Sequence, residues 1–309
     1  MSTRAMTRLD GWREFLHKNR VREALEAYVL ILPTLLGLVI FTAGPILAAL
    51  YFSFTNWNLL STPKWLGLAN YINLFTNDPL FWTTLKNTAY YVIGTVPVGT
   101  CLALLLALAL NQKIYGLAIF RTVYFLPVVS SVVAISVLWV WLYQADFGLI
   151  NQFLRLFGIT GIRWLSSPTW AMPAIIIMSI WHGLGYSIVI FIAGLQSIPH
   201  DYYEAARIDG ANSWQQFRYI TIPLISPVTF FVIILSLISS FQVFEQAYVM
   251  TQGGPVNATK TIVYYLYQNG FMYFHMGYAS ALAYILFVII VVITLLQFSL
   301  QKHWVHYEL

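Results

Sequence analysis

Long apolar stretches alternate with short polar segments along the chain. Six of these stretches reach about 20 residues, the length of helix that crosses a bilayer. They cover residues 28–52, 87–110, 122–143, 170–194, 223–244 and 276–300. The pattern therefore predicts an all-α integral membrane protein with six transmembrane helices.

Composition narrows the class of protein. The 309 residues are 59% hydrophobic and 9% charged, whereas a soluble domain carries roughly 25% charged residues. No small-residue cleavage site on a short apolar core marks the first stretch as a signal peptide, so we expect it to be retained. The predicted organisation is a basic N-terminal segment (1–27), a membrane domain (28–300) and a tail (301–309).

Lys and Arg are unevenly divided between the two sides that six crossings define. Eleven lie in the N-terminal segment, the loops after the second and fourth stretches, and the tail; five lie in the other loops. Positive residues stay in the cytoplasm, so we expect both termini and segment 197–223 to be cytoplasmic. The net charge of +5 then reflects topology rather than nucleic-acid binding.

Several predicted spans contain Pro or Gly, among them Pro97, Pro127, Gly183 and Gly185. In a bilayer, a broken helix persists only where neighbouring groups or cavity water satisfy the released backbone carbonyls. We therefore expect some spans to line a cavity, the alternative for most individual Pro and Gly residues being an ordinary kink or close helix packing.

Segment 197–223 is a polar island between the fourth and fifth stretches. It predicts two short helices: Ser197 caps the first, Gly210 ends it, and Asn212 or Ser213 caps the second. Residues spaced by three and four share one side of the first helix, where small alanines let another protein approach closely. We expect a docking surface rather than a catalytic site, the alternative being a plain loop on the headgroups. Its residues are Tyr202, Tyr203, Glu204, Ala205, Ala206, Asp209 and Gly210.

The island carries a family resemblance. Glu204-Ala205-Ala206, Gly210, Ile220 and Pro223 have the spacing of the motif in membrane-spanning subunits of binding-protein-dependent ABC importers, with Ile222 where Leu is usual. Segments 251–255 and 277–281 resemble an outer loop and the start of the last span in the sugar branch of that family. From residue 28 to its C-terminus the chain thus resembles a maltose-type or glycerol-phosphate-type permease subunit.

This resemblance implies a type I ABC importer permease fold in the bacterial cytoplasmic (inner) membrane. The first island helix would be the coupling helix, seated in a groove of a cytoplasmic ATPase. The implied partners are a second permease subunit, different from this chain or a second copy of it, two ATPase subunits, and an extracytoplasmic solute-binding protein. The chain contains no Gly-x-x-x-x-Gly-Lys-Ser/Thr sequence, so we expect ATP and Mg on the ATPase and no cofactor here. No thiolate or carboxylate cluster accompanies its histidines and no Gly-x-Ser-x-Gly elbow occurs, so we expect no metal site and no catalytic residue.

Charge is nearly absent from the predicted spans, Glu245 being the closest approach, which argues against a proton- or ion-driven carrier. Hydroxyl-bearing stripes instead follow the two spans that flank the island, where the resemblance places the solute contacts. The candidates are Ser179, His182, Gly183, Tyr186, Ser236, Ser239, Ser240 and Gln242, and Trp181 could stack on a sugar ring. We expect a sugar or polyol-like solute: a mono-, di- or oligosaccharide or a glycerol derivative.

Two other functional classes stay open from the residues alone. A secondary carrier would need no ATPase, and vanadate would leave its uptake unchanged. A membrane-embedded enzyme, such as a polyprenyl or acyl transferase, would require a cluster of polar catalytic groups at one membrane face, and the sequence contains no such cluster.

Overall fold

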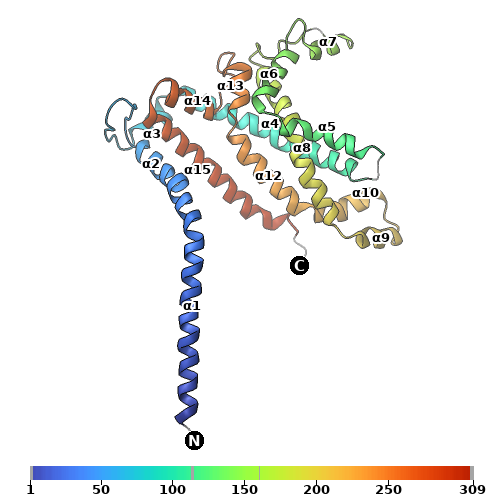
Figure 1. The fold of residues 1–309 in the computed structure, drawn as a ribbon. Coiled ribbons are helices and arrows are strands. Elements are labelled where there is room, and N and C mark those ends of the chain that lie inside the picture. Colours follow the sequence, from blue (N-terminus) through green and yellow to red (C-terminus); the bar gives the residue numbers. More distant parts are fainter. Residues whose placement is uncertain (1–2, 113–114, 160, 307–309) are drawn as a thin grey trace.

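A computed structural model describes residues 3–112, 115–159 and 161–306 (Figure 1). Lys113, which enters the charge count above, and residues 307–309 of the predicted tail lie outside these ranges. Apart from one isolated bridge between Thr55 and Trp65, the described residues form helices, turns and irregular segments without strands. The predicted all-α class is confirmed.

The helical part of the described chain consists of fifteen α-helices, three π-helical turns and one 3₁₀ turn. The α-helices are α1 (Thr3–Leu38), α2 (Gly44–Ser53), α3 (Ala69–Thr76), α4 (Pro79–Leu110), α5 (Leu117–Val129), α6 (Val132–Leu142), α7 (Leu149–Arg155), α8 (Ala171–Ser197), α9 (His200–Ile208), α10 (Ser213–Gln216), α11 (Ile222–Leu224), α12 (Ser226–Phe241), α13 (Glu245–Thr251), α14 (Ile262–Tyr267) and α15 (Met276–Leu300). The π-helical turns are η1 (Val39–Ala43), η2 (Phe217–Thr221) and η3 (Gln268–Met272), and η4 (Gln301–His303) is a 3₁₀ turn.

Each predicted apolar stretch corresponds to a candidate membrane span. Four candidates are continuous: Asn19–Ser53, Pro79–Leu110, Ala171–Ser197 and Met276–His303. The third and fifth are bent pairs, Thr122–Val129 with Val132–Leu142 at 110° and Ser213–Leu224 with Ser226–Phe241 at 61°. The described chain therefore has up to six spans when each bent pair counts as one.

The second span starts well before residue 87, the predicted start. Asp78 caps α4, since its carboxylate accepts hydrogen bonds from the N–H groups of Leu80 and Phe81 at 3.0 and 3.1 Å. Pro79 then occupies the first helical position, where its missing N–H costs nothing. The helix begins at a local cap rather than at the edge of the apolar run.

Most of the Pro and Gly residues considered above do not break helices. α4 continues through Pro97, and α8 continues through Gly183 and Gly185. The sharp bend in the third span falls at Ser130 and Ser131, just after Pro127. A break is therefore present near Pro127. It is absent at Gly183 and Gly185, where a break was expected, and Pro97 fits the alternative of an ordinary residue within a packed helix.

The glycines of α8 serve close packing instead. A Cβ at Gly185 would lie 2.2 Å from the carbonyl oxygen of Tyr124 on α5, and one at Gly194 would lie 2.6 Å from Val228 on α12. Lipid tails are as apolar as side chains, so spans associate through such close contact. α8 thereby packs against α4, α5 and α12 at the centre of the bundle.

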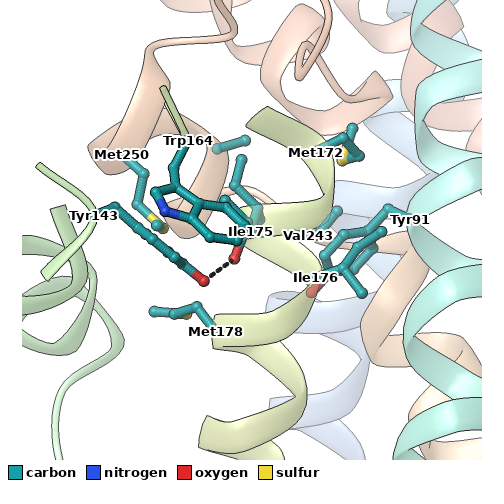
Figure 2. Close-up of a cluster of buried hydrophobic side chains, with 11 residues drawn as sticks. Tyr91, Tyr143, Trp164, Met172, Ile175, Ile176, Met178, Val243 and Met250 are labelled. Carbon is teal, nitrogen blue, oxygen red and sulfur yellow. Dashed lines mark hydrogen bonds between the residues drawn. The ribbon is translucent and has the colours of Figure 1, made fainter. Parts of the chain in front are cut away.

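An aromatic cluster joins α6, α7 and α8 at the end of the bundle away from α9 (Figures 1 and 2). The hydroxyl of Tyr143 donates to the carbonyl of Ala174 at 3.0 Å, and its ring lies 5.2 Å from that of Trp164. The indole of Trp164 donates to Asn151 Oδ1 at 2.9 Å. These buried polar groups are paired, so the cluster holds this end of α8 in place.

α1 stands apart from the rest of the chain (Figure 1). The most apolar window of the span Asn19–Ser53 has no buried residue, and Phe41 is 81% exposed. Contact with the bundle is made by α2, which packs on α15, where the Tyr284 hydroxyl donates to the Ile46 carbonyl at 2.5 Å. The described part of the N-terminal segment continues into this span as one helix.

We expect Gly185→Ala to destabilise the protein by about 1–3 kcal/mol, because the new methyl group overlaps the α5 backbone. Gly183→Ala is the matched control: it lies on the same helix, and a Cβ there meets nothing within 4 Å. Thermal unfolding of the two purified variants in detergent measures the difference. Equal midpoints would contradict the close crossing of α5 and α8.

Candidate functional site

A cavity of about 600 Å³ lies between α4, α8, α12 and the start of α13. The structure brings all eight predicted solute contacts to its wall: Ser179, His182, Gly183, Tyr186, Ser236, Ser239, Ser240 and Gln242. Its volume falls within the range of small-molecule sites. The geometry gathers these residues in one place, and their contact with a solute stays a prediction.

α8 contributes one stripe to this cavity because its predicted residues are spaced by three and four along an unbroken helix. His182 Nε2 lies 3.4 Å from the carbonyl of Ser130, which the bend between α5 and α6 exposes. Tyr186 is 53% exposed. The stripe therefore combines a polar contact at a helix break with a free aromatic ring.

α12 contributes the second stripe. The Ser239 hydroxyl donates to the Ser236 carbonyl at 3.1 Å, which is the usual local bond of a serine in a spanning helix. α12 ends at Phe241, so Gln242 lies beyond its last turn. The amide of Gln242 thus lines the cavity from a helix end rather than from a helix face.

Two walls of the cavity were not predicted. α4 supplies Tyr91, Thr95 and Thr100, and α13 supplies Glu245 and Gln246. The side-chain oxygens of Thr100 and Gln246 are buried without a hydrogen-bond partner in the described part of the chain. The spacing of four between Tyr91, Thr95 and Gly99 is a signal that could have indicated the α4 wall.

Trp181 is not among the residues that line this cavity, so the cavity gives no support to the prediction that it stacks on a solute ring. Its ring packs against that of Trp139, with centroids 5.4 Å apart. Trp181 follows Ser179 by two positions, which places it on a different side of α8 from the cavity stripe.

The predicted docking segment is α9 and the turn that follows it. Gly210 has a φ of +81°. Its N–H donates to the Arg207 carbonyl, and the N–H of Ala211 donates to the Ala206 carbonyl. This pair of bonds is a Schellman turn, so Gly210 ends α9 as predicted. Asn212 caps α10 in a reciprocal pair with Gln215, at 2.9 and 2.8 Å. The link between the two helices is therefore fixed at both ends.

One predicted cap is wrong. Ser197 belongs to the last turn of α8, and its hydroxyl donates back to the Gly194 carbonyl at 2.8 Å. α9 starts after Pro199 without a side-chain cap. The Ser197 hydroxyl has a carbonyl of its own helix within reach, and it bonds that carbonyl instead of capping α9.

The docking candidates divide between two faces of α9. Tyr202, Glu204, Ala205, Asp209 and Gly210 are exposed. Tyr203 and Ala206 are half-buried, and the Tyr203 hydroxyl lies 3.0 Å from that of Thr221 on η2, which ties α9 to the fifth span. Ile208, 86% exposed, was missed, although an isoleucine within a polar segment was a visible signal.

No described residues form a group of three or more His, Cys, Asp or Glu side chains that could hold a metal ion. A family model described as "binding-protein-dependent transport system inner membrane component" matches residues 99–305. The chain belongs to this family. The permease is also similar over nearly its whole length to curated relatives and to solved structures.

The "probable ABC transporter permease protein YesP" of Bacillus subtilis (strain 168) is 41% identical, with 93% of this chain and 94% of that protein covered. The "lactose transport system permease protein LacF" of Rhizobium radiobacter is 37% identical, with 89% and 93% covered. The "arabinooligosaccharides transport system permease protein AraP" of Bacillus subtilis (strain 168) is 33% identical, with 94% and 92% covered.

Among solved structures, the permease resembles a bacterial ABC transporter involved in the import of the acidic polysaccharide alginate. The TM-score is 0.81 at 26% identity, and the match covers 93% of this chain and 98% of that chain. A bacterial alginate ABC transporter in complex with an alginate pentasaccharide-bound periplasmic protein has the same TM-score at 24% identity, with 92% and 96% covered. The predicted type I importer permease fold is confirmed.

We expect Thr100→Val to keep or raise the stability of the permease, because the substitution breaks no hydrogen bond and removes a buried, unpaired oxygen. Thr88→Val, on the same helix, is the contrasting variant. The Thr88 hydroxyl donates to the Thr84 carbonyl at 2.8 Å and accepts from the Ile262 N–H at 3.0 Å, so its loss should cost about 1–3 kcal/mol. Thermal unfolding distinguishes them, and equal losses would show that Thr100 is paired.

Proposed function

We propose that this chain is the permease subunit of an ATP-driven importer that moves a sugar or polyol-like solute across the bacterial cytoplasmic membrane. The cavity between α4, α8 and α12 is the observation that carries the proposal, because eight candidate contacts converge on it. Relatives named for lactose and arabinooligosaccharide transport support the class of solute.

The chemistry of the cavity wall suits a hydroxyl-rich solute. Hydroxyl and amide groups both donate and accept hydrogen bonds, and the exposed ring of Tyr186 offers a face for a sugar ring. Thr100 and Gln246 leave buried oxygens without a described partner, and Glu245 is the carboxylate at the wall. Since an unpaired buried oxygen is costly, a solute that hydrogen-bonds these groups would recover free energy.

Energy would enter through α9. The exposed side of α9 presents Tyr202, Glu204, Ala205, Ile208 and Asp209 to a cytoplasmic ATPase, which would carry the ATP and Mg. The Schellman turn, the Asn212 cap and the Tyr203–Thr221 contact join α9 to the fifth span. Movement of the ATPase pair would therefore be transmitted to α8 and α12 together. The rigid-body motion would open the central cavity alternately to the two sides of the membrane.

A second permease subunit would cover α1. The first span buries no residue of its most apolar window against its own bundle, and spanning helices gain stability from close packing against other helices. An extracytoplasmic solute-binding protein would deliver the solute at the end of the bundle away from α9; the dependence of the family on a binding protein supports this partner. The unpacked span favours two permease chains in each assembly.

We expect Gly210→Asp to abolish transport while the chain still inserts into the membrane, because the substitution strains the turn and adds charge at the docking surface. Gly116→Asp is the matched control: Gly116 also has a positive φ, of +78°, and open space around it. Uptake by cells and the amount of chain in the membrane fraction are measured together. Normal uptake by the Gly210 variant would refute the coupling role.

We expect Tyr186→Ala to lower uptake at limiting solute about tenfold, equivalent to about 1.4 kcal/mol of lost contact. The assay uses liposomes that contain both permease chains and the ATPase, with the binding protein outside and radiolabelled neutral sugars as solutes. Trp181→Ala removes an aromatic ring from the same helix outside the cavity and should leave uptake near the wild-type rate. Uptake that persists without ATP or with vanadate would instead indicate a secondary carrier.

A further inference from the structure

A second cavity, of about 460 Å³, lies at the end of the bundle opposite α9. It is an open pocket lined by the segment after α2, by α3 and by the regions around η3 and the start of α15, and it shares no residue with the central cavity. We call it the asparagine pocket. Its lining residues are Asn56, Trp57, Asn70, Asn73, Asn77, Asp78, Tyr265, Asn269, His275 and Tyr278.

α3 and its C-cap place three asparagines on one wall. Asn70 and Asn73 lie within α3, and Asn77 is the residue that follows its last turn, at spacings of three and four. Asparagine is a poor helix former, which makes such a stripe within and just after an eight-residue helix unexpected for stability alone. The stripe indicates that this face is kept for contacts outside the helix.

The asparagines differ in how much of their bonding capacity is used. Asn70 is 8% exposed, and its amide donates to the Ser53 and Thr55 carbonyls at 2.8 Å each, so it fixes the wall. Asn73 and Asn77 are exposed, and their side chains make no hydrogen bond to another described residue. Two amides are therefore free to bind a ligand.

Asp78 gives the pocket no free charge. One carboxylate oxygen caps α4, and the other accepts the hydroxyls of Tyr265 and Tyr278 at 2.7 and 2.5 Å. Burial, with Asp78 alongside, raises the pKa of Tyr265 to about 12, which keeps that hydroxyl protonated as a donor. With its carboxylate satisfied and no Lys or Arg on its wall, the pocket does not suit an ionic ligand.

We propose that the asparagine pocket binds a neutral polyhydroxyl ligand: the sugar being imported, held at the outer face before it enters the central cavity. Amides match hydroxyls because both donate and accept hydrogen bonds. Trp57, held by stacking on Phe52 at 4.1 Å, adds an aromatic side chain to the wall. This inference rests on the proposed function, and it adds a binding site outside the bilayer to that function.

The test uses the full complex in lipid nanodiscs without binding protein, in a Tyr186→Ala background that weakens the central cavity. Lactose, arabinotriose and maltotriose are the probes, and saturation-transfer NMR reports their contact with protein. Asn73→Ala with Asn77→Ala should reduce the transferred signal at least threefold for one or more probes. Asn111→Ala, an exposed asparagine at the other end of α4, should leave it unchanged.

An unchanged signal in the double variant, or no signal from the parent complex with any probe, overturns the proposal. A double variant that loses affinity for the binding protein but keeps its sugar signal also overturns it, and assigns the pocket to protein docking. ATP-driven uptake is measured in parallel with wild-type Tyr186. Uptake of the probes without an asparagine-dependent signal refutes the outer site alone, whereas a failure to import any sugar refutes the proposed function.

Discussion

Hydrocarbon offers no hydrogen-bond partner to a peptide N–H or C=O, and this constraint shapes the permease more than any single contact. Long helices satisfy most of their own backbone groups, so we expect interruptions where polar surroundings can satisfy the released groups. The bend at Ser130 exposes a carbonyl to His182, and the end of α12 leaves Gln242 beyond the last turn. Both irregularities adjoin the central cavity, which lies where helices are interrupted.

Features governed by local chemistry could be predicted from the sequence. Gly210 ends α9 and Asn212 caps α10 because the positive φ and the cap each need a particular residue type at one position. Ser197 shows the limit of that reasoning, since its hydroxyl had a competing acceptor in its own helix. The stripes on α8 and α12 could also be predicted, because spacing along a helix determines which residues share a face.

Features governed by packing between distant segments could not be predicted. The α4 wall of the cavity needs Tyr91 and Thr100 to lie opposite α8 and α12, and nothing in the apolar pattern of α4 specifies that neighbour. Asp78 meets Tyr265 and Tyr278 across almost two-thirds of the chain. The sequence indicated a helix break at Gly185, whereas in the structure its missing side chain admits the α5 backbone within a continuous helix.

The isolation of α1 has a consequence for the life of the protein in the cell. A helix that buries no residue of its most apolar window against its own chain gains its packing stability from what binds it, and by mass action that gain depends on the supply of the partner. Copies made in excess of their partner would leave an unpacked apolar helix in the bilayer, available to quality-control proteases. The abundance of this permease would then follow the scarcer of the two chains, and matched synthesis would be as much a condition of its stability as any residue in its core.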